Sequence, residues 1–278
     1  MTNFDKVKMY YSKFNEWDRL EIPSGKLEFE LTVPIITGHL PQNAEILDLG
    51  GGPGRYTITL AKLGHKLHLA DLSPTLLAIA KQKISELKEI DEISAGNIKS
   101  INEVNALDLS LYASSSFDAV LLFGPLYHLT NENERLRCLR EVKRVLKPGG
   151  LVFAAFIPRL SGIMGILARM FMSPEQVDVK TLECVLEMGV FNNMADVGFQ
   201  EAYYPTAEDV TSMFNDCGFD EVLLRSVRGW GHGREAEILG LVDEEPGKYR
   251  ALIELINKTA CEPGIIAVGS HAVYVGRV

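Results

Sequence analysis

The sequence lacks the features of a disulfide-stapled, zinc-knuckle or membrane-spanning protein. Its four cysteines, Cys138, Cys184, Cys217 and Cys261, are far apart and form no C-x-x-C pair. Neither a disulfide framework nor a zinc knuckle is therefore predicted. No apolar run approaches membrane-spanning length, and charged residues interrupt residues 1–17, which excludes a signal-peptide core there. We therefore expect a soluble, cytoplasmic protein with reduced cysteines and no membrane partner.

The sequence also lacks an excess of positive charge. It has 28 Lys and Arg against 37 Asp and Glu, which gives a formal net charge of −9. Binding of nucleic-acid phosphates depends on clustered basic side chains, so this balance argues against a nucleic-acid partner. No compact cluster of Asp, Glu and His indicates a metal site. Linkers rich in Pro, Gly or Ser, internal repeats and low-complexity tracts are missing as well, so we expect one domain over residues 1–278.

What the chain does have is a series of apolar, β-rich runs separated by helical patterns. The runs cover residues 44–50, 65–71, 117–124, 150–156, 219–227 and 271–278. Alternation of strands and helices is typical of an α/β protein with a doubly wound parallel sheet. The 278 residues are enough to bury a full core of this kind.

Two of the helices between these runs have clear start signals. Ser73 and Pro74 stand where a helix cap and a first helical residue are expected, and Asn131 can cap a second helix. The segments 158–200 and 229–268 do not fit the simple alternation. We expect both to be helical insertions that form a substrate cap.

The stretch "ILDLGGGPGRYT" leads from a strand into a glycine-rich turn at residues 50–54. Glycines at alternate positions let the backbone bend sharply and approach a ligand closely. The spacing fits a pyrophosphate loop poorly, because the last glycine of G-x-G-x-x-G would fall on Arg55 or Thr57. Asp71 ends the second run, where a carboxylate can accept hydrogen bonds from ribose hydroxyls. The pattern indicates a ribose-containing ligand, although an ordinary turn and a helix-capping Asp71 would look the same.

Five segments together resemble successive motifs of the class I S-adenosylmethionine-dependent methyltransferases of the small-molecule type. They are "LDLGGGPGRYT", "LHLADLSP", "NALDL", "FDAVLLFGPLYHL" and "LKPGGLVFAAF". The resemblance is good from residue 10 to residue 156 and looser to residue 278. It implies a Rossmann-like, seven-stranded, mostly parallel sheet with an antiparallel last strand. It also implies S-adenosylmethionine as cofactor and S-adenosylhomocysteine as product.

The resemblance assigns the first cofactor contacts to the glycine turn and its neighbours. Gly50 and Gly52 would border the methionine moiety, with Gly51 between them in the same turn. Asp48 would fix the turn and the amino group of the ligand. Asp71 would hold the ribose.

The remaining cofactor contacts would lie farther along the chain. Leu72 would cover one adenine face, and Asn105, followed by Ala106, would contact the adenine amino group. The family often has Asp in place of Asn105, so Asp108 is an alternative. Phe123, at the end of the fourth strand, would lie near the methionine end.

The first 25 residues contain "YYSKFNEWDRL", which resembles the helix that closes over the cofactor in many relatives. Tyr10 or Tyr11 could hydrogen-bond the methionine carboxylate, and Arg19 could pair with it. Packing of aromatic residues at helical spacing explains the same pattern. We expect residues 1–25 to form an N-terminal helical lid.

The predicted reaction is in-line transfer of a methyl group to a small organic acceptor, with positioning as the main catalytic effect. His128 is the candidate base if the acceptor must lose a proton, and Tyr127 would shape the acceptor pocket. Simple helix capping or packing remains the alternative for both residues. An RNA or protein substrate, a nicotinamide-dependent oxidoreductase and a non-catalytic cofactor sensor also stay open, as does the oligomeric state.

Overall fold

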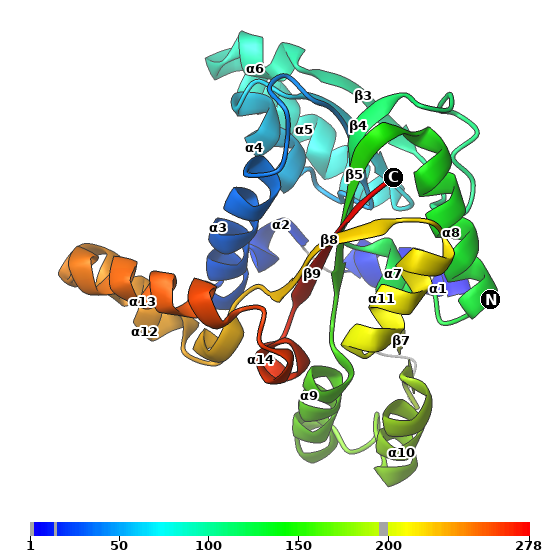
Figure 1. Ribbon diagram of the computed structural model, residues 1–278, viewed down its shortest axis with the longest axis vertical. Helices are drawn as coiled ribbons and strands as arrows, with labels where there is room; N and C mark the ends of the chain where they lie inside the picture. Colours follow the sequence, from blue (N-terminus) through cyan, green and yellow to red (C-terminus); the bar gives the residue numbers. More distant parts are fainter. Residues whose placement is uncertain (1–2, 14–15, 195–199) are drawn as a thin grey trace.

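A seven-stranded sheet forms the centre of the computed structural model, which describes residues 3–13, 16–194 and 200–278 (Figure 1). The strand order is β3-β2-β1-β4-β5-β9-β8, and only β9 runs antiparallel to its neighbours. The strands are β1 (Glu45–Leu49), β2 (Lys66–Asp71), β3 (Ile98–Glu103), β4 (Phe117–Leu122), β5 (Leu146–Phe156), β8 (Asp220–Ser226) and β9 (Ala272–Arg277). The predicted doubly wound, mostly parallel sheet is confirmed.

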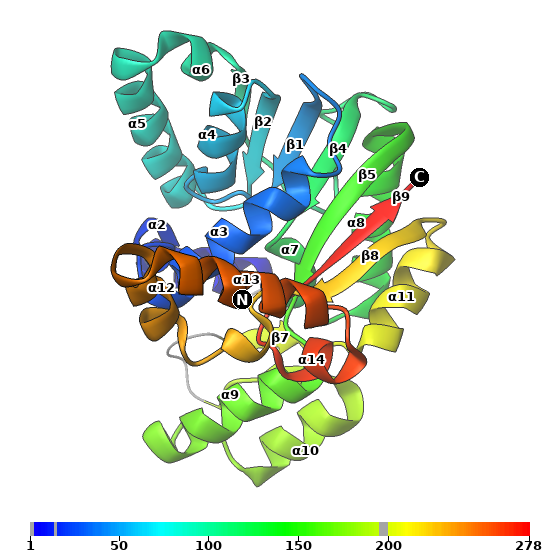
Figure 2. The same cartoon turned by 60° about the vertical axis from the view of Figure 1, so that its left-hand side comes forward.

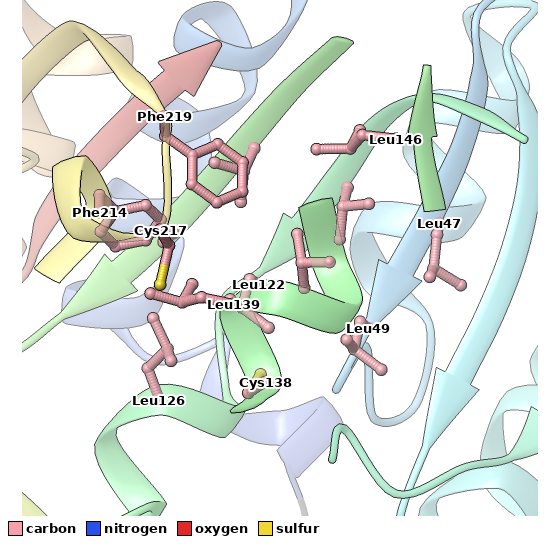
Figure 3. Packing of buried hydrophobic residues seen from close by; sticks show 14 of the residues in the cluster. Leu47, Leu49, Leu122, Leu126, Cys138, Leu139, Leu146, Phe214, Cys217 and Phe219 are labelled. Atoms are coloured by element: carbon pink, nitrogen blue, oxygen red, sulfur yellow. The ribbon is translucent and has the colours of Figure 1, made fainter. Parts of the chain in front are cut away.

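One face of the sheet packs against α8 (Glu132–Val145) and α11 (Ala207–Asp216). Figure 3 shows this core, in which Leu122 of β4, Leu139 of α8 and Phe214 of α11 lie close together. Tyr274 of β9 stacks on Phe214, with ring centroids 4.1 Å apart. Together these side chains form the apolar core on this face of the sheet.

The other face is covered by α3 (Pro23–Thr37) and α4 (Arg55–Lys62), with α12 (Glu235–Glu244) and α13 (Pro246–Thr259) beyond them (Figure 2). Val273 and Val275 of β9 belong to this second core, whereas Tyr274 belongs to the first. Residues in a strand alternate between the two faces, so β9 contributes side chains to both cores.

The helix start signals act as the sequence predicts. The Ser73 Oγ accepts a hydrogen bond from the Leu76 backbone N–H at 3.4 Å, and α5 (Pro74–Ile90) begins at the next residue. The Asn131 Oδ1 accepts from the Asn133 N–H at 2.9 Å and caps α8. A short helix, α6 (Glu92–Gly96), then leads into β3. Strand β3 is absent from the apolar runs because it is a partly buried edge strand of sequence IKSINE.

The segments that interrupt the alternation contain most of the remaining helices. Residues 158–200 hold α9 (Arg159–Met172), α10 (Val179–Met188) and the strand β6 (Val190–Asn192), which pairs with β7 (Glu201–Tyr203) just beyond. Residues 195–199 of this segment lie outside the described residues. Between 229 and 268 the chain forms a 3-10 turn (Gly229–Gly231), α12, α13 and α14 (Pro263–Val268). Figures 1 and 2 both show α9 and α10 together at one end of the molecule, away from α5 and α6.

The N-terminal segment contains α1 (Asn3–Lys13) and α2 (Glu16–Arg19), and residues 1–2 and 14–15 lie outside the described part. Within the described ranges, no helix has the length and apolar composition needed to cross a bilayer. In the same part of the chain, no group of three or more His, Cys, Asp and Glu residues could hold a metal ion.

Candidate functional site

The turn between β1 and α4 depends on glycine. Gly50, Gly52 and Gly54 have φ values of +75°, +54° and +83°, a region that L-residues with a Cβ rarely adopt. A Cβ on Gly51 would lie 2.5 Å from the Asp48 Cγ, whereas a Cβ on Gly52 would meet nothing closer than 3.5 Å. The turn is therefore packed tightly beneath Gly51 and open above Gly52.

Asp71 ties the end of β2 to this turn. Its Oδ2 accepts a hydrogen bond from the Gly52 N–H at 2.8 Å, and its Oδ1 accepts from the Ser73 N–H at 2.7 Å. The residue is 8% exposed, and burial raises the pKa of its carboxyl against the opposing effect of these donors. Each carboxylate oxygen can accept more than one hydrogen bond, so Asp71 keeps acceptor capacity for a ligand.

Asp48 lies beneath the turn at the end of β1. Its Oδ2 accepts a hydrogen bond of 2.6 Å from the Thr57 hydroxyl of α4, which links the strand to the following helix. Burial raises the pKa of the Asp48 carboxyl to about 6. This arrangement is consistent with the predicted role of Asp48 in fixing the turn.

A pocket opens at the carboxyl ends of β1, β2 and β4, where ligands of open α/β sheets bind. Apart from the alternatives Tyr10 and Asp108, all the side chains and glycines that the sequence assigned to the site line it. They are Tyr11, Arg19, Asp48, Gly50, Gly51, Gly52, Asp71, Leu72, Asn105, Ala106, Phe123, Tyr127 and His128. The structure thus brings the predicted residues together, and their roles toward a ligand stay predictions.

The pocket lining also distinguishes Asn105 from its alternative Asp108, and Tyr11 from its alternative Tyr10. Asn105 lines it, and its Oδ1 accepts a hydrogen bond of 2.9 Å from the Leu107 N–H. Asp108 is exposed, bonds the Ser110 N–H and does not line the pocket. Of the two tyrosines of α1, Tyr11 lines the pocket and Tyr10 does not.

Helix α1 forms one wall of the pocket through Phe4, Val7, Lys8 and Tyr11. The Lys8 Nζ donates to the Glu103 Oε1 at 2.7 Å, and this exposed ion pair joins α1 to the end of β3. Sequence reasoning missed Phe4, Val7 and Lys8. Their spacing of three and four residues from one another and from Tyr11 is the pattern of one helix face, and this pattern could have identified them.

Tyr11 connects α1 with α7 (Pro125–His128) at the other end of the pocket. Its hydroxyl lies 2.9 Å from the His128 Nε2 and also hydrogen-bonds with Tyr127. Burial lowers the pKa of His128 to about 3 and raises the pKa of both tyrosines above its ordinary value. His128 is therefore a neutral hydrogen-bonding partner near pH 7, which makes it a weak proton acceptor.

Arg19 reaches the pocket from α2 and is held by two carboxylates. Its Nε pairs with Glu16, and one of its terminal nitrogens lies 3.7 Å from the Glu28 Oε1. Glu28 of α3 also accepts from the His271 Nδ1 at 2.6 Å and lies 3.6 Å from the Arg228 Nε. This buried charged network was not predicted, because its members are distant in the sequence.

The comparisons with known proteins agree with the site. Residues 47–154 match the family model described as a methyltransferase domain. A putative methyltransferase of Bacillus subtilis, YqeM, is 32% identical over 118 residues, which are 42% of this chain and 44% of that protein. The ubiquinone/menaquinone biosynthesis C-methyltransferase UbiE of Pectobacterium carotovorum is 26% identical over 198 residues, which cover 65% of this chain and 68% of that protein. The match with the Bacillus protein thus spans less than half of its length.

A solved structure shows the same fold. The crystal structure of a SAM-dependent methyltransferase of Methanosarcina mazei aligns with a TM-score of 0.58 and 21% identity, over 88% of this chain and 96% of that one. The family match covers the glycine turn, Asp71 and β4, and the fold match covers most of the chain. Residues 47–154 therefore match a methyltransferase domain, and the chain as a whole shares the fold of the solved SAM-dependent methyltransferase.

Proposed function

We propose that this protein transfers the methyl group of S-adenosylmethionine to a small organic acceptor. The observation that carries the proposal is the pocket itself, which lies between the glycine turn and helix α1. Tyr11, Tyr127 and His128 gather at the end where the predicted methionine moiety would lie. UbiE of Pectobacterium carotovorum is named for quinone biosynthesis, which agrees with a small acceptor.

The residues of the pocket fit the cofactor. Gly52 faces open space in which a ligand can approach the backbone, and a Cβ at this position would occupy that space. Asp71 beside it offers carboxylate oxygens to ribose hydroxyls. Leu72 and Ala106 offer apolar surface for an adenine ring, and Arg19 offers a cation for a carboxylate. The donor set therefore matches an adenosyl group that carries an amino acid.

The chemistry that the cofactor supplies when bound is an electrophilic methyl group on a sulfonium. Helix α1 would exclude water from the pocket, because Tyr11 and its neighbours form a wall of it. Tyr127 and Tyr11 stay protonated, since burial raises the pKa of both. They can orient an acceptor by hydrogen bonds, while the neutral His128 holds Tyr11 in place. Positioning of the acceptor is thus the main catalytic effect we expect.

Other functions are less well supported. An RNA substrate is disfavoured by the net charge of −9, and a nicotinamide cofactor is disfavoured by the glycine spacing. A protein substrate would need access to a methyl group that lies behind α1. A non-catalytic sensor would bind the cofactor but turn over no acceptor.

Titration calorimetry with S-adenosylmethionine, S-adenosylhomocysteine and NADH tests the cofactor. We expect both adenosyl ligands to bind and NADH to give no heat. Transfer of labelled methyl groups is then measured on a panel of small molecules, a total RNA sample and a protein extract. Labelling of RNA or protein alone would contradict a small acceptor, and binding of NADH alone would contradict the cofactor site.

A further inference from the structure

Helix α9 has an unusual distribution of side chains. Its inner face contains Gly162 and Ile166, and a Cβ on Gly162 would lie 2.7 Å from the Tyr204 ring. Arg169 follows at helical spacing on the same face. The outer face exposes Leu160, Met164, Leu167 and Phe171 to solvent. An amphipathic helix normally turns its apolar stripe inward and its charges outward, so an arginine on the inner face breaks the local rule.

Arg169 lies among aromatic rings. Its guanidinium carbon is 5.5 Å from the centroid of Phe191, a fully buried residue of β6. Its charge also acts on the hydroxyls of Tyr204 and of Tyr10 on α1. The ring of Tyr10 is 5.0 Å from the ring of Tyr11, which lines the pocket. Arg169 therefore acts electrostatically on Tyr10, the neighbour of a pocket-lining residue, but does not itself line the pocket.

One nitrogen of the Arg169 guanidinium lacks a hydrogen-bonding partner. Its Nη1 is buried without a partner, and within the described ranges no acidic side chain forms a salt bridge with Arg169. Arg159 and Arg135 do have hydrogen-bonding partners, although the Nε of Arg135 is also buried without one. Arg159, at the start of the same helix, pairs with Asp209 at 2.7 Å, and Arg135 donates to two backbone carbonyls.

We propose that Arg169 binds an acidic group of the methyl acceptor, either a carboxylate or a phosphate. A guanidinium presents donors in a planar fork that matches both groups. An anion would satisfy the buried Nη1 and neutralise the charge on the inner face of α9. The inference rests on the proposed function and adds the class of its substrate, an anionic small molecule.

The test uses simple probes on the full chain saturated with S-adenosylhomocysteine. Affinities of benzoate and phenyl phosphate are compared with those of the neutral benzamide and benzyl alcohol by calorimetry. The variants are Arg169→Gln, Arg169→Lys and the control Arg137→Gln, which removes an exposed arginine of α8 and reports non-specific anion binding. Thermal unfolding verifies that each variant is folded.

We expect the wild type and Arg137→Gln to bind one acidic probe at least tenfold more tightly than its neutral counterpart. Arg169→Gln should abolish this preference, and Arg169→Lys should keep part of it. Equal affinities for acidic and neutral probes in the wild type would overturn the inference without any variant. An unchanged preference in folded Arg169→Gln would also overturn it. Failure of S-adenosylhomocysteine to bind would count against the proposed function instead, because the probe comparison can be repeated without it.

Discussion

Replacement of Asp71 by alanine tests the ribose site most directly. In the structure both carboxylate oxygens accept backbone hydrogen bonds, at 2.8 Å from Gly52 and 2.7 Å from Ser73. Loss of the hydrogen bonds to ribose hydroxyls should weaken binding of S-adenosylhomocysteine by about 1–3 kcal/mol. This corresponds to a roughly 5- to 150-fold increase in Kd. Calorimetric titration of wild type and Asp71→Ala measures the change.

The same substitution also leaves the Gly52 and Ser73 N–H groups without their acceptor, so a looser turn could weaken binding indirectly. A ligand without ribose hydroxyls separates the two effects. The 2′,3′-dideoxy analogue should bind the wild type less tightly than S-adenosylhomocysteine does, whereas Asp71→Ala should bind both ligands equally. A turn that is merely loosened would weaken both ligands by the same factor.

Asp108→Ala is the matched control, because Asp108 is exposed and bonds only a neighbouring N–H at 3.0 Å. It should bind S-adenosylhomocysteine as the wild type does. Unchanged affinity in folded Asp71→Ala would refute the assignment of the ribose site. If Asp71→Ala weakens binding of the dideoxy analogue by the same factor as binding of S-adenosylhomocysteine, a direct contact of Asp71 with the ribose is refuted. Asp71 would then act on the ligand only through the turn.

Three further predictions concern the turn, its buried acid and the helix α1. Gly52→Ala should reduce cofactor affinity and cost about 1–2 kcal/mol of stability from its φ of +54°. Gly51→Ala should lower the free energy of unfolding more, because its Cβ would lie 2.5 Å from the Asp48 Cγ; urea unfolding compares the two variants. Since the folded pKa of Asp48 is about 6 against 3.8, the native state binds more protons between these values, and stability should fall by about 2 kcal/mol as pH rises from 4 to 6. Asp48→Asn should remove this part of the urea-unfolding pH profile, and a profile parallel to the wild type would contradict the linkage. Tyr11→Phe should lower kcat more than cofactor affinity, because it leaves His128 without its hydroxyl partner; a change confined to affinity would contradict that role.

The centre of the sheet could be predicted because its strands are buried on both faces. The sequences of β1, β4 and β5 read as nearly continuous apolar runs, as expected for parallel strands between two helical layers. Strand β3 could not be found in this way. It lies at the edge, is only partly buried and has only two apolar residues, Ile98 and Ile101, in its sequence IKSINE. Its place was implied only by the family resemblance.

The cofactor side of the pocket was predictable for a topological reason. The carboxyl ends of parallel strands meet at one edge of the sheet, so residues that follow β1, β2 and β4 must gather there. No such topological rule predicts the charged network around Glu28. Glu28 and His271 are separated by 243 positions, yet they lie 2.6 Å apart. Nothing local in the sequence signals such a contact, because it depends on how α3 packs against the last strand.

The difference between contacts that follow from sheet topology and long-range contacts also explains why the acceptor is harder to predict than the cofactor. The family match ends at residue 154, before Arg159 and the whole of α9 begin. At one end of the pocket, Tyr11 of α1 contacts His128 of α7, 117 positions along the chain. The family match therefore carries information on the methyl donor, whereas Arg169, which we propose contacts the acceptor, lies outside it. The proposed acceptor class therefore depends on Arg169, whose guanidinium lies over Phe191 and whose buried Nη1 has no hydrogen-bonding partner.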